Sequence, residues 1–339
     1  MKERINRFDN LKFLLILLVV FGHFIDYFFK YSINIQRLFI IIYSFHMPLF
    51  IFMVGLFSKK VKSIKKTDSK KVFFYIIISL LIKMTIFIIE SIYYKSNFDI
   101  FGGPDIYWFL FVIAVYTLLI PVISKFNLNF LLVFSIVFAL VAGYDNNIGD
   151  FLALSRMIVF FPFFLSGYML SERKNELNNF ISKSKLKYLA VLILIVFILF
   201  CIFKINHIYH FRGLFIGRSG YEILKITKYA WCSRITAYIF QFVISASILF
   251  IIPNKKFRLF TKYGKKSIQV YIFHVPMVII FNQLPFVSKF FHRWPNAYII
   301  FCMIISVFVT YLLSSAVFTR VVEGLKKFVF IKEKREKKI

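Results

Sequence analysis

Residues 11–29 of the chain read LKFLLILLVVFGHFIDYFF. Only three of these side chains can carry a charge near neutral pH, namely Lys12, His23 and Asp26. A helix of roughly 20 apolar residues crosses the hydrocarbon core of a bilayer, so this stretch predicts a membrane-spanning helix. No small-residue cleavage site follows it, and we therefore expect a retained span rather than a cleaved signal peptide.

Stretches of the same kind recur along the whole chain. Nine more are long enough, or nearly so, to span a bilayer: 38–57, 72–92, 107–124, 128–143, 157–170, 187–203, 230–252, 268–284 and 297–319. Hydrophobic residues make up 60% of the chain and the mean hydropathy is +0.77, too apolar for a soluble domain. We therefore expect an all-α integral membrane protein with ten transmembrane helices in residues 1–319, followed by a basic cytoplasmic tail at 320–339.

The charge distribution predicts the orientation. The chain carries 44 Lys and Arg against 15 Asp and Glu, a formal net charge of +29. In a soluble protein this balance would indicate nucleic acid, but here the basic residues lie between apolar runs, so we expect no nucleic-acid partner. With both termini in the cytoplasm, 31 of the 44 basic residues fall in cytoplasmic segments and 11 in outer loops. The expected location is the cell membrane, with a basic face against anionic lipids.

Ionisable residues inside the spans are the candidate functional residues, because burying them in lipid is costly. His23 follows Lys12 by eleven residues, about three helical turns, so both lie on one helix face about 16 Å apart. Asp26 lies one turn further on the same face, where its carboxylate would orient the imidazole. His46, in the second span, is expected at a depth similar to that of His23.

The other candidates carry weaker signals. We interpret His274, in the ninth span, as a structural or cofactor-lining residue, and Arg156 lies at the outer entrance of the sixth span. His207 and His210 are three residues apart, but no acidic or Cys ligand accompanies them, so we expect no metal site. The chain has only three Cys, which excludes a disulfide-rich secreted class.

Five blocks follow one another along the chain: RFDNLK at 7–12 with VFGH at 20–23, SFHMPLFIF at 44–52, YWFL at 107–110, FPFF at 161–164 after Arg156, and YIFHVP at 271–276. Together they resemble the membrane-bound acyltransferase-3 family, whose first helix carries a basic residue, ten intervening residues and a His. The chain is similar to the short members related to fucose 4-O-acetylases and capsular polysaccharide O-acetyltransferases. It differs in having Lys12 where the family usually has Arg, which makes an anion contact geometrically looser.

The resemblance implies a bacterial O-acetyltransferase that moves an acetyl group from cytosolic acetyl-CoA to a sugar hydroxyl of a polysaccharide or a lipid-linked sugar. His23 would be the general base, with Asp26 and His46 assisting, because a sugar hydroxyl is a poor nucleophile at neutral pH. A covalent acetyl-His intermediate stays open, as does a homodimer. The implied donor contacts are Lys12, Lys59, Lys60 and His274, and the implied sugar contacts are Tyr107, Trp108 and Arg156.

Two other function classes use the same residues differently. A transporter or flippase for a lipid-linked sugar would need the cavity without bond chemistry, but no internal repeat supports it. A non-catalytic scaffold would leave the cost of His23, Asp26 and His46 in the membrane unexplained.

Overall fold

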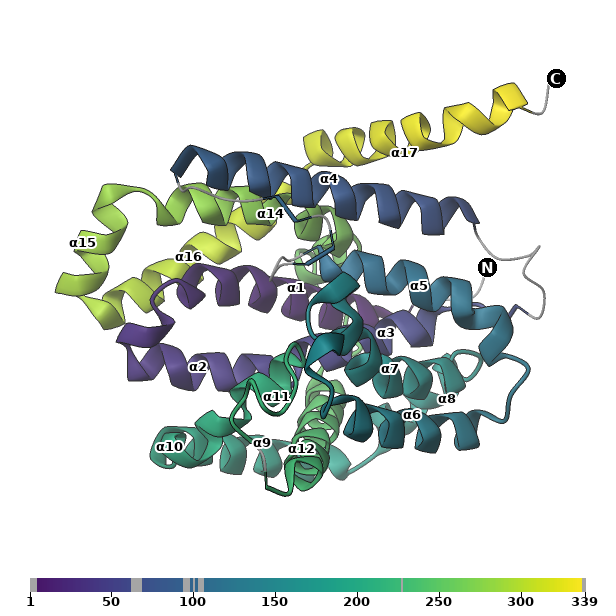
Figure 1. The fold of residues 1–339 in the computed structure, drawn as a ribbon, viewed down its shortest axis with the longest axis horizontal. Coiled ribbons are helices and arrows are strands. Elements are labelled where there is room, and N and C mark those ends of the chain that lie inside the picture. The colour runs from purple at the N-terminus through teal and green to yellow at the C-terminus, as the bar shows by residue number, and fades with distance from the viewer. Residues whose placement is uncertain are drawn as a thin grey trace.

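The protein is built from helices. The computed structural model describes residues 5–61, 69–93, 98–99, 101–102, 107–226 and 228–336. Every regular element in these ranges is a helix and none is a strand, which confirms the predicted all-α class. The long helices lie against one another in a bundle (Figure 1).

The elements follow in order along the chain. The first half comprises α1 (Asn6–Asp26), η1 (Phe29–Tyr31), α2 (Ile33–Tyr43), α3 (His46–Phe57), α4 (Ser69–Tyr93), α5 (Trp108–Ile123), α6 (Leu128–Ala142), η3 (Asn146–Ile148), η4 (Phe151–Ala153) and α7 (Leu154–Met169). The second half comprises α8 (Lys174–Lys183), α9 (Leu186–Phe203), α10 (Ile205–Ile208), η5 (Tyr209–Phe211), α11 (Arg212–Ile216), α12 (Ala230–Ile251), α13 (Phe260–Gly264), α14 (Ser267–Asn282), α15 (Pro285–Arg293), α16 (Pro295–Leu313) and α17 (Ala316–Glu336).

Each of the ten predicted apolar stretches overlaps a helix. Within the described residues, seven helical segments are long and apolar enough to cross a membrane, and an eighth forms if α14 and α15, bent by 74°, are taken as one span. The two shorter apolar helices, α5 and α6, cover the predicted stretches 107–124 and 128–143. The protein is therefore a polytopic membrane protein, while the count of ten spans and the cytoplasmic termini stay predictions.

Proline positions explain two breaks in the helices. Helix α3 begins at His46, after a break at Ser44 and Phe45 that separates it from α2. Pro48 lacks a backbone N–H, which the first turn of a helix does not need, and this break places Pro48 in the first turn of α3. Pro285 likewise opens α15, after Gln283 and Leu284 end the run of α14. The first of these breaks puts His46 at a helix start inside the bundle.

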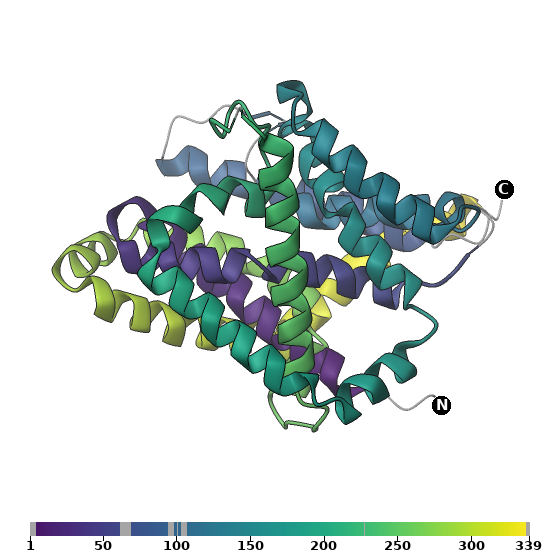
Figure 2. The same cartoon turned by 90° about the horizontal axis from the view of Figure 1, so that it is seen from below.

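Helix α1 is the centre of the bundle. It packs against α3, α13, α14 and α16, and Figure 1 shows it between α4 and α14 on one side and α2 on the other. Helix α12, the green helix standing upright in Figure 2, runs across the tilt of α1 and packs against α9. The predicted tail residues 320–336 belong to α17, which packs against α4 and α14.

Helices α3 and α7 pack closely through two glycines. Gly55 of α3 faces the backbone of Phe164 and Tyr168, and Gly167 of α7 faces the backbone of Phe52. Small residues let membrane helices approach this closely without a hydrophobic driving force between them. The pair therefore holds the helices that carry His46 and Arg156 at a fixed separation.

Candidate active site

A cavity of about 280 Å³ inside the bundle, here called the His23 cavity, gathers five of the ten predicted site residues. His23 and Asp26 reach it from α1, and His46 from the start of α3. Trp108 lines it from α5 and Arg156 from α7. Five side chains from four helices, predicted separately from the sequence, thus meet at one place.

Two histidines, His23 and His46, line this cavity, and a third, His274, packs against His23 without lining it. The rings of His23 and His274 have centroids 5.4 Å apart, although about 250 residues separate them in the chain. Nδ1 of His46 lies 2.8 Å from the carbonyl oxygen of Ile42, and Nδ1 of His274 lies 2.8 Å from that of Tyr271. A carbonyl only accepts, so Nδ1 carries the proton in both rings and Nε2 keeps its lone pair. Neutral His46 and His274 are therefore acceptors at Nε2.

Asp26 has a different neighbour from the one the sequence predicts. No hydrogen bond joins it to His23 in the structure; instead its carboxylate interacts electrostatically with Arg212 of α11. The Arg212 guanidinium lies 4.1 Å from the ring centroid of Phe29, which fixes its position by a cation–π contact. The role of Asp26 as an orienting group for His23 stays a prediction.

Arg156 is a buried cation at the wall of the cavity. Its side chain is 6% exposed, and its guanidinium carbon lies 5.0 Å from the centroid of the Trp108 ring. Among the described residues it makes no ion pair with a carboxylate, although Asp150 interacts with it at longer range. A buried guanidinium without a close anion favours binding of negative charge in the cavity.

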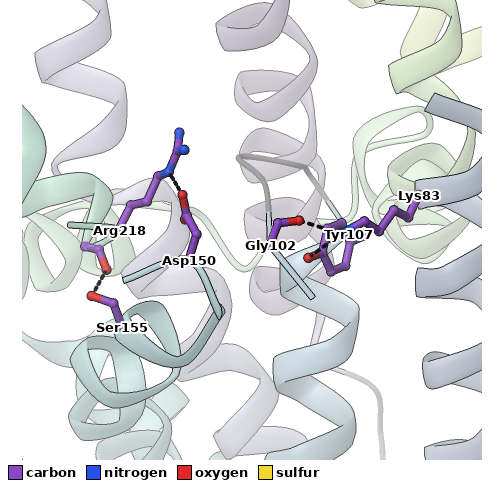
Figure 3. A network of polar contacts seen from close by, with 7 residues as sticks. Lys83, Gly102, Tyr107, Asp150, Ser155 and Arg218 are labelled. Atoms are coloured by element: carbon purple, nitrogen blue, oxygen red, sulfur yellow. Dashed lines mark hydrogen bonds and ion pairs between the residues drawn. The ribbon is translucent and has the colours of Figure 1, made fainter. Parts of the chain in front are cut away.

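The surrounding loops are fixed by the contacts in Figure 3. Lys83 donates to the carbonyl oxygen of Gly102 at 2.5 Å and to the Tyr107 hydroxyl at 3.1 Å. Arg218 forms an ion pair with Asp150, and the Ser155 hydroxyl donates to the carbonyl oxygen of Gly217 at 2.9 Å. Tyr107 itself does not line the cavity. It anchors the start of α5 instead, directly before Trp108.

A second cavity, of about 190 Å³, surrounds the other end of the α1 face and is here called the Lys12 cavity. Lys12, Lys71 and Lys265 give it positive charge, and Phe50 and Phe109 give it apolar walls. Lys12 lies 3.5 Å from Asp9 and 4.3 Å from the centroid of the Phe57 ring.

One face of α1 runs along both cavities. Lys12 and Ile16 line the Lys12 cavity, and Val19, His23 and Asp26 line the His23 cavity. These positions alternate by three and four residues, which keeps them on one helix face. The predicted common face of Lys12, His23 and Asp26 is therefore confirmed.

Comparison with known proteins gives one match. The sequence model of the acyltransferase domain named acyltransferase 3 matches residues 5–315. The chain belongs to the acyltransferase-3 family. No curated protein and no solved structure matches it.

The acyltransferase places the other predicted donor residues apart from these cavities. Lys60 forms a 2.8 Å ion pair with Glu172, and this hydrogen bond lowers the pKa of the Glu172 carboxyl. Lys59 is exposed, and neither lysine lines the Lys12 cavity or the His23 cavity. Of the neighbouring lysines, Lys62, Lys65 and Lys66 lie outside the described residues, whereas Lys70 and Lys71 are described and Lys71 lines the Lys12 cavity. Among the described residues no group of three or more His, Cys, Asp or Glu could hold a metal ion.

Two residues of this acyltransferase were missed by the sequence reasoning. Tyr271, the first residue of the YIFHVP block, is the one side chain that lines both described cavities. Its ring packs 5.0 Å from that of Phe109 and 5.7 Å from that of His274, measured between centroids. Arg212 of α11 interacts with Asp26. The block and the basic, aromatic residues around Arg212 were visible signals, but they did not reveal which residues Tyr271 and Arg212 would meet.

Proposed function

We propose that this acyltransferase moves an acetyl group from cytosolic acetyl-CoA to a sugar hydroxyl of a cell-surface or lipid-linked polysaccharide in the bacterial cell membrane. The observation that carries the proposal is the single face of α1 that holds Lys12 in one cavity and His23 in the other. A path along this face connects a basic entrance with a buried base. An acyl donor with an anionic head and a reactive thioester end matches that arrangement.

The donor enters the Lys12 cavity. The positive charge of Lys12, Lys71 and Lys265 attracts the anionic donor, and the apolar walls formed by Phe50 and Phe109 suit its uncharged arm. Tyr271 separates this cavity from His23, so the thioester must pass the Tyr271 ring to react.

His23 acts as the general base. The sugar hydroxyl attacks the thioester carbonyl and gives its proton to His23; the C–S bond then breaks, and the CoA thiolate takes that proton. His274 packs against His23, and its Nε2 atom makes no hydrogen bond with the described residues. This atom can accept a hydrogen bond from the protonated ring nitrogen of His23, which leaves the other ring nitrogen of His23 free to act as the base. A positioned base of this kind contributes about 10²–10⁴-fold to the rate.

Charge and aromatic surface in the His23 cavity serve the acceptor and the transition state. The Arg156 guanidinium stabilises negative charge that develops on the carbonyl oxygen or is carried by the acceptor. The Trp108 ring, held under Arg156, offers a face on which a sugar can stack. Neutral His46 accepts at Nε2 and suits a second sugar hydroxyl.

The test is NMR of the surface polysaccharide from the native host, with and without the gene. Loss of one O-acetyl resonance, restored by the wild-type gene but not by an equally expressed His23→Ala variant, supports the proposal. A glycan that keeps every acetyl signal overturns the polysaccharide acceptor. A glycan that is absent altogether favours instead a flippase for a lipid-linked sugar.

A further inference from the structure

A basic groove opens beside the Lys12 cavity, between α4, α14 and α17. It encloses about 570 Å³, and five lysines line it: Lys70, Lys71, Lys265, Lys266 and Lys326. Glu323 is the one carboxylate in its lining. Five cations against one anion around a concave surface give a strongly positive field, which concentrates anions carrying several charges.

The groove is continuous with the Lys12 cavity. Lys71, Tyr75, Lys265 and Ile268 line both spaces. The Lys12 cavity in turn meets the His23 cavity at Tyr271. A single extended ligand can therefore lie with its charged end in the groove and its other end directed towards His23.

The framework of the groove is built by buried polar contacts. Lys266 donates to the carbonyl oxygen of Ser314 and to the Thr319 hydroxyl, each at 2.9 Å. Gln269 donates to the carbonyl oxygen of Leu313 at 2.6 Å. These bonds fasten the start of α17 to α14, so that Lys326, two turns further along α17, projects over α4 with its ammonium 5.6 Å from the Phe74 ring centroid. The lysines of three separate segments are thus held around one space.

We propose that this groove binds the phosphates of the donor's nucleotide, while the rest of the donor lies in the Lys12 cavity. The proposal rests on the proposed function, because the groove is useful in this way only if the donor is a CoA thioester. It assigns the phosphate contacts to lysines of α4, of the residues just before α14, and of α17, in place of Lys59 and Lys60. A phosphate of an anionic lipid headgroup shares the same chemistry, and the experiment separates the two sources.

Two variants and one matched control test the groove. Lys265→Gln and Lys326→Gln each remove one cation that lines it, whereas Lys327→Gln removes an exposed neighbour on α17 that does not. The full-length protein is placed in nanodiscs of zwitterionic lipid, which contain no anionic headgroup. Binding of adenosine 3′,5′-bisphosphate is measured directly, and KM is measured for acetyl-CoA and for S-acetylpantetheine, which lacks the nucleotide.

The proposal predicts that wild type and Lys327→Gln bind the bisphosphate alike. Each groove variant should bind it about tenfold more weakly, the loss of about one charge-assisted hydrogen bond. In each groove variant, the factor by which KM rises over wild type should be about tenfold larger for acetyl-CoA than for S-acetylpantetheine.

The proposal is overturned if wild type does not bind the bisphosphate, or if wild type and all variants bind it equally. It is also overturned if the variants weaken only the binding of vesicles rich in phosphatidylserine. Failure of the proposed function is recognised separately. In that case wild type transfers no acetyl group from either donor, whatever the bisphosphate result.

Discussion

Adding one methyl group between α3 and α7 should disable the acyltransferase without unfolding it. The perturbation is Gly55→Ala. A Cβ atom built on Gly55 would lie 2.0 Å from the carbonyl oxygen of Phe164 and 2.8 Å from the amide nitrogen of Tyr168. Both contacts are to helix backbone, which cannot rotate away as a side chain would.

The size of the effect follows from these distances. Real Cβ atoms essentially never come within 3.0 Å of such neighbours, so the two helices must separate by about 1 Å. Overpacking of this kind costs about 1–3 kcal/mol of stability. Because α3 begins at His46 and α7 carries Arg156, the same shift displaces groups in the His23 cavity. A displacement of about 1 Å in a catalytic constellation can cost about 10²-fold in rate.

The assay combines thermal unfolding in detergent with acetyl transfer in membranes. Gly55→Ala should lower the unfolding temperature and reduce transfer by about 100-fold, while the purified protein stays helical. The matched control is Gly324→Ala in α17, where a Cβ meets nothing within 4 Å. A helix gains about 0.5–1 kcal/mol from Gly to Ala at an exposed site, so this control should be neutral or slightly stabilised. Wild-type stability and activity in Gly55→Ala would refute the reasoning about helix separation.

Three further changes have distinct expected outcomes. Tyr271→Ala joins the Lys12 cavity and the His23 cavity, so the rate of acetyl-CoA hydrolysis without a sugar acceptor should be higher than in Tyr271→Phe. Equal hydrolysis rates in the two variants would contradict the inference that the Tyr271 ring separates the cavities. Arg7→Ala removes buried hydrogen bonds, including those to Asn178 and to the carbonyl oxygen of Ile252, and should lower the free energy of unfolding by about 2–3 kcal/mol; an unchanged denaturant midpoint would count against this. Lys60→Ala removes only an exposed ion pair, so its unfolding temperature and its KM for acetyl-CoA should equal those of wild type; a raised KM would return this lysine to the donor site.

The sequence predicted well those features that depend on one helix at a time. The apolar runs predicted the helices because a membrane-spanning segment must form hydrogen bonds among its own backbone groups and can bury few charges. The spacing of Lys12, His23 and Asp26 gave a common face because helical periodicity alone determines it. Position 48 is a proline, and its place in the first turn of α3, which begins at His46, likewise depends on one helix alone.

Contacts between distant helices were not predictable from one sequence. The approach of His274 to His23, and of Arg212 to Asp26, depends on how helices far apart in the chain pack together. The same holds for Tyr271, whose place between two cavities is a property of the assembled bundle. Charge density does not distinguish Lys59 and Lys60 from Lys71, and of these three only Lys71 meets Lys265 in the Lys12 cavity.

The most direct test of the account follows radioactive acetyl from acetyl-CoA in membranes that contain the protein and the host glycan. Wild type is compared with His23→Ala and with His207→Ala, a variant of an exposed histidine of α10 that lines neither the His23 cavity nor the Lys12 cavity. We predict that label reaches the glycan with wild type and His207→Ala and that His23→Ala, expressed at the same level, transfers at least about 100-fold less. Transfer by His23→Ala at the wild-type rate would contradict the central claim that His23 is the general base.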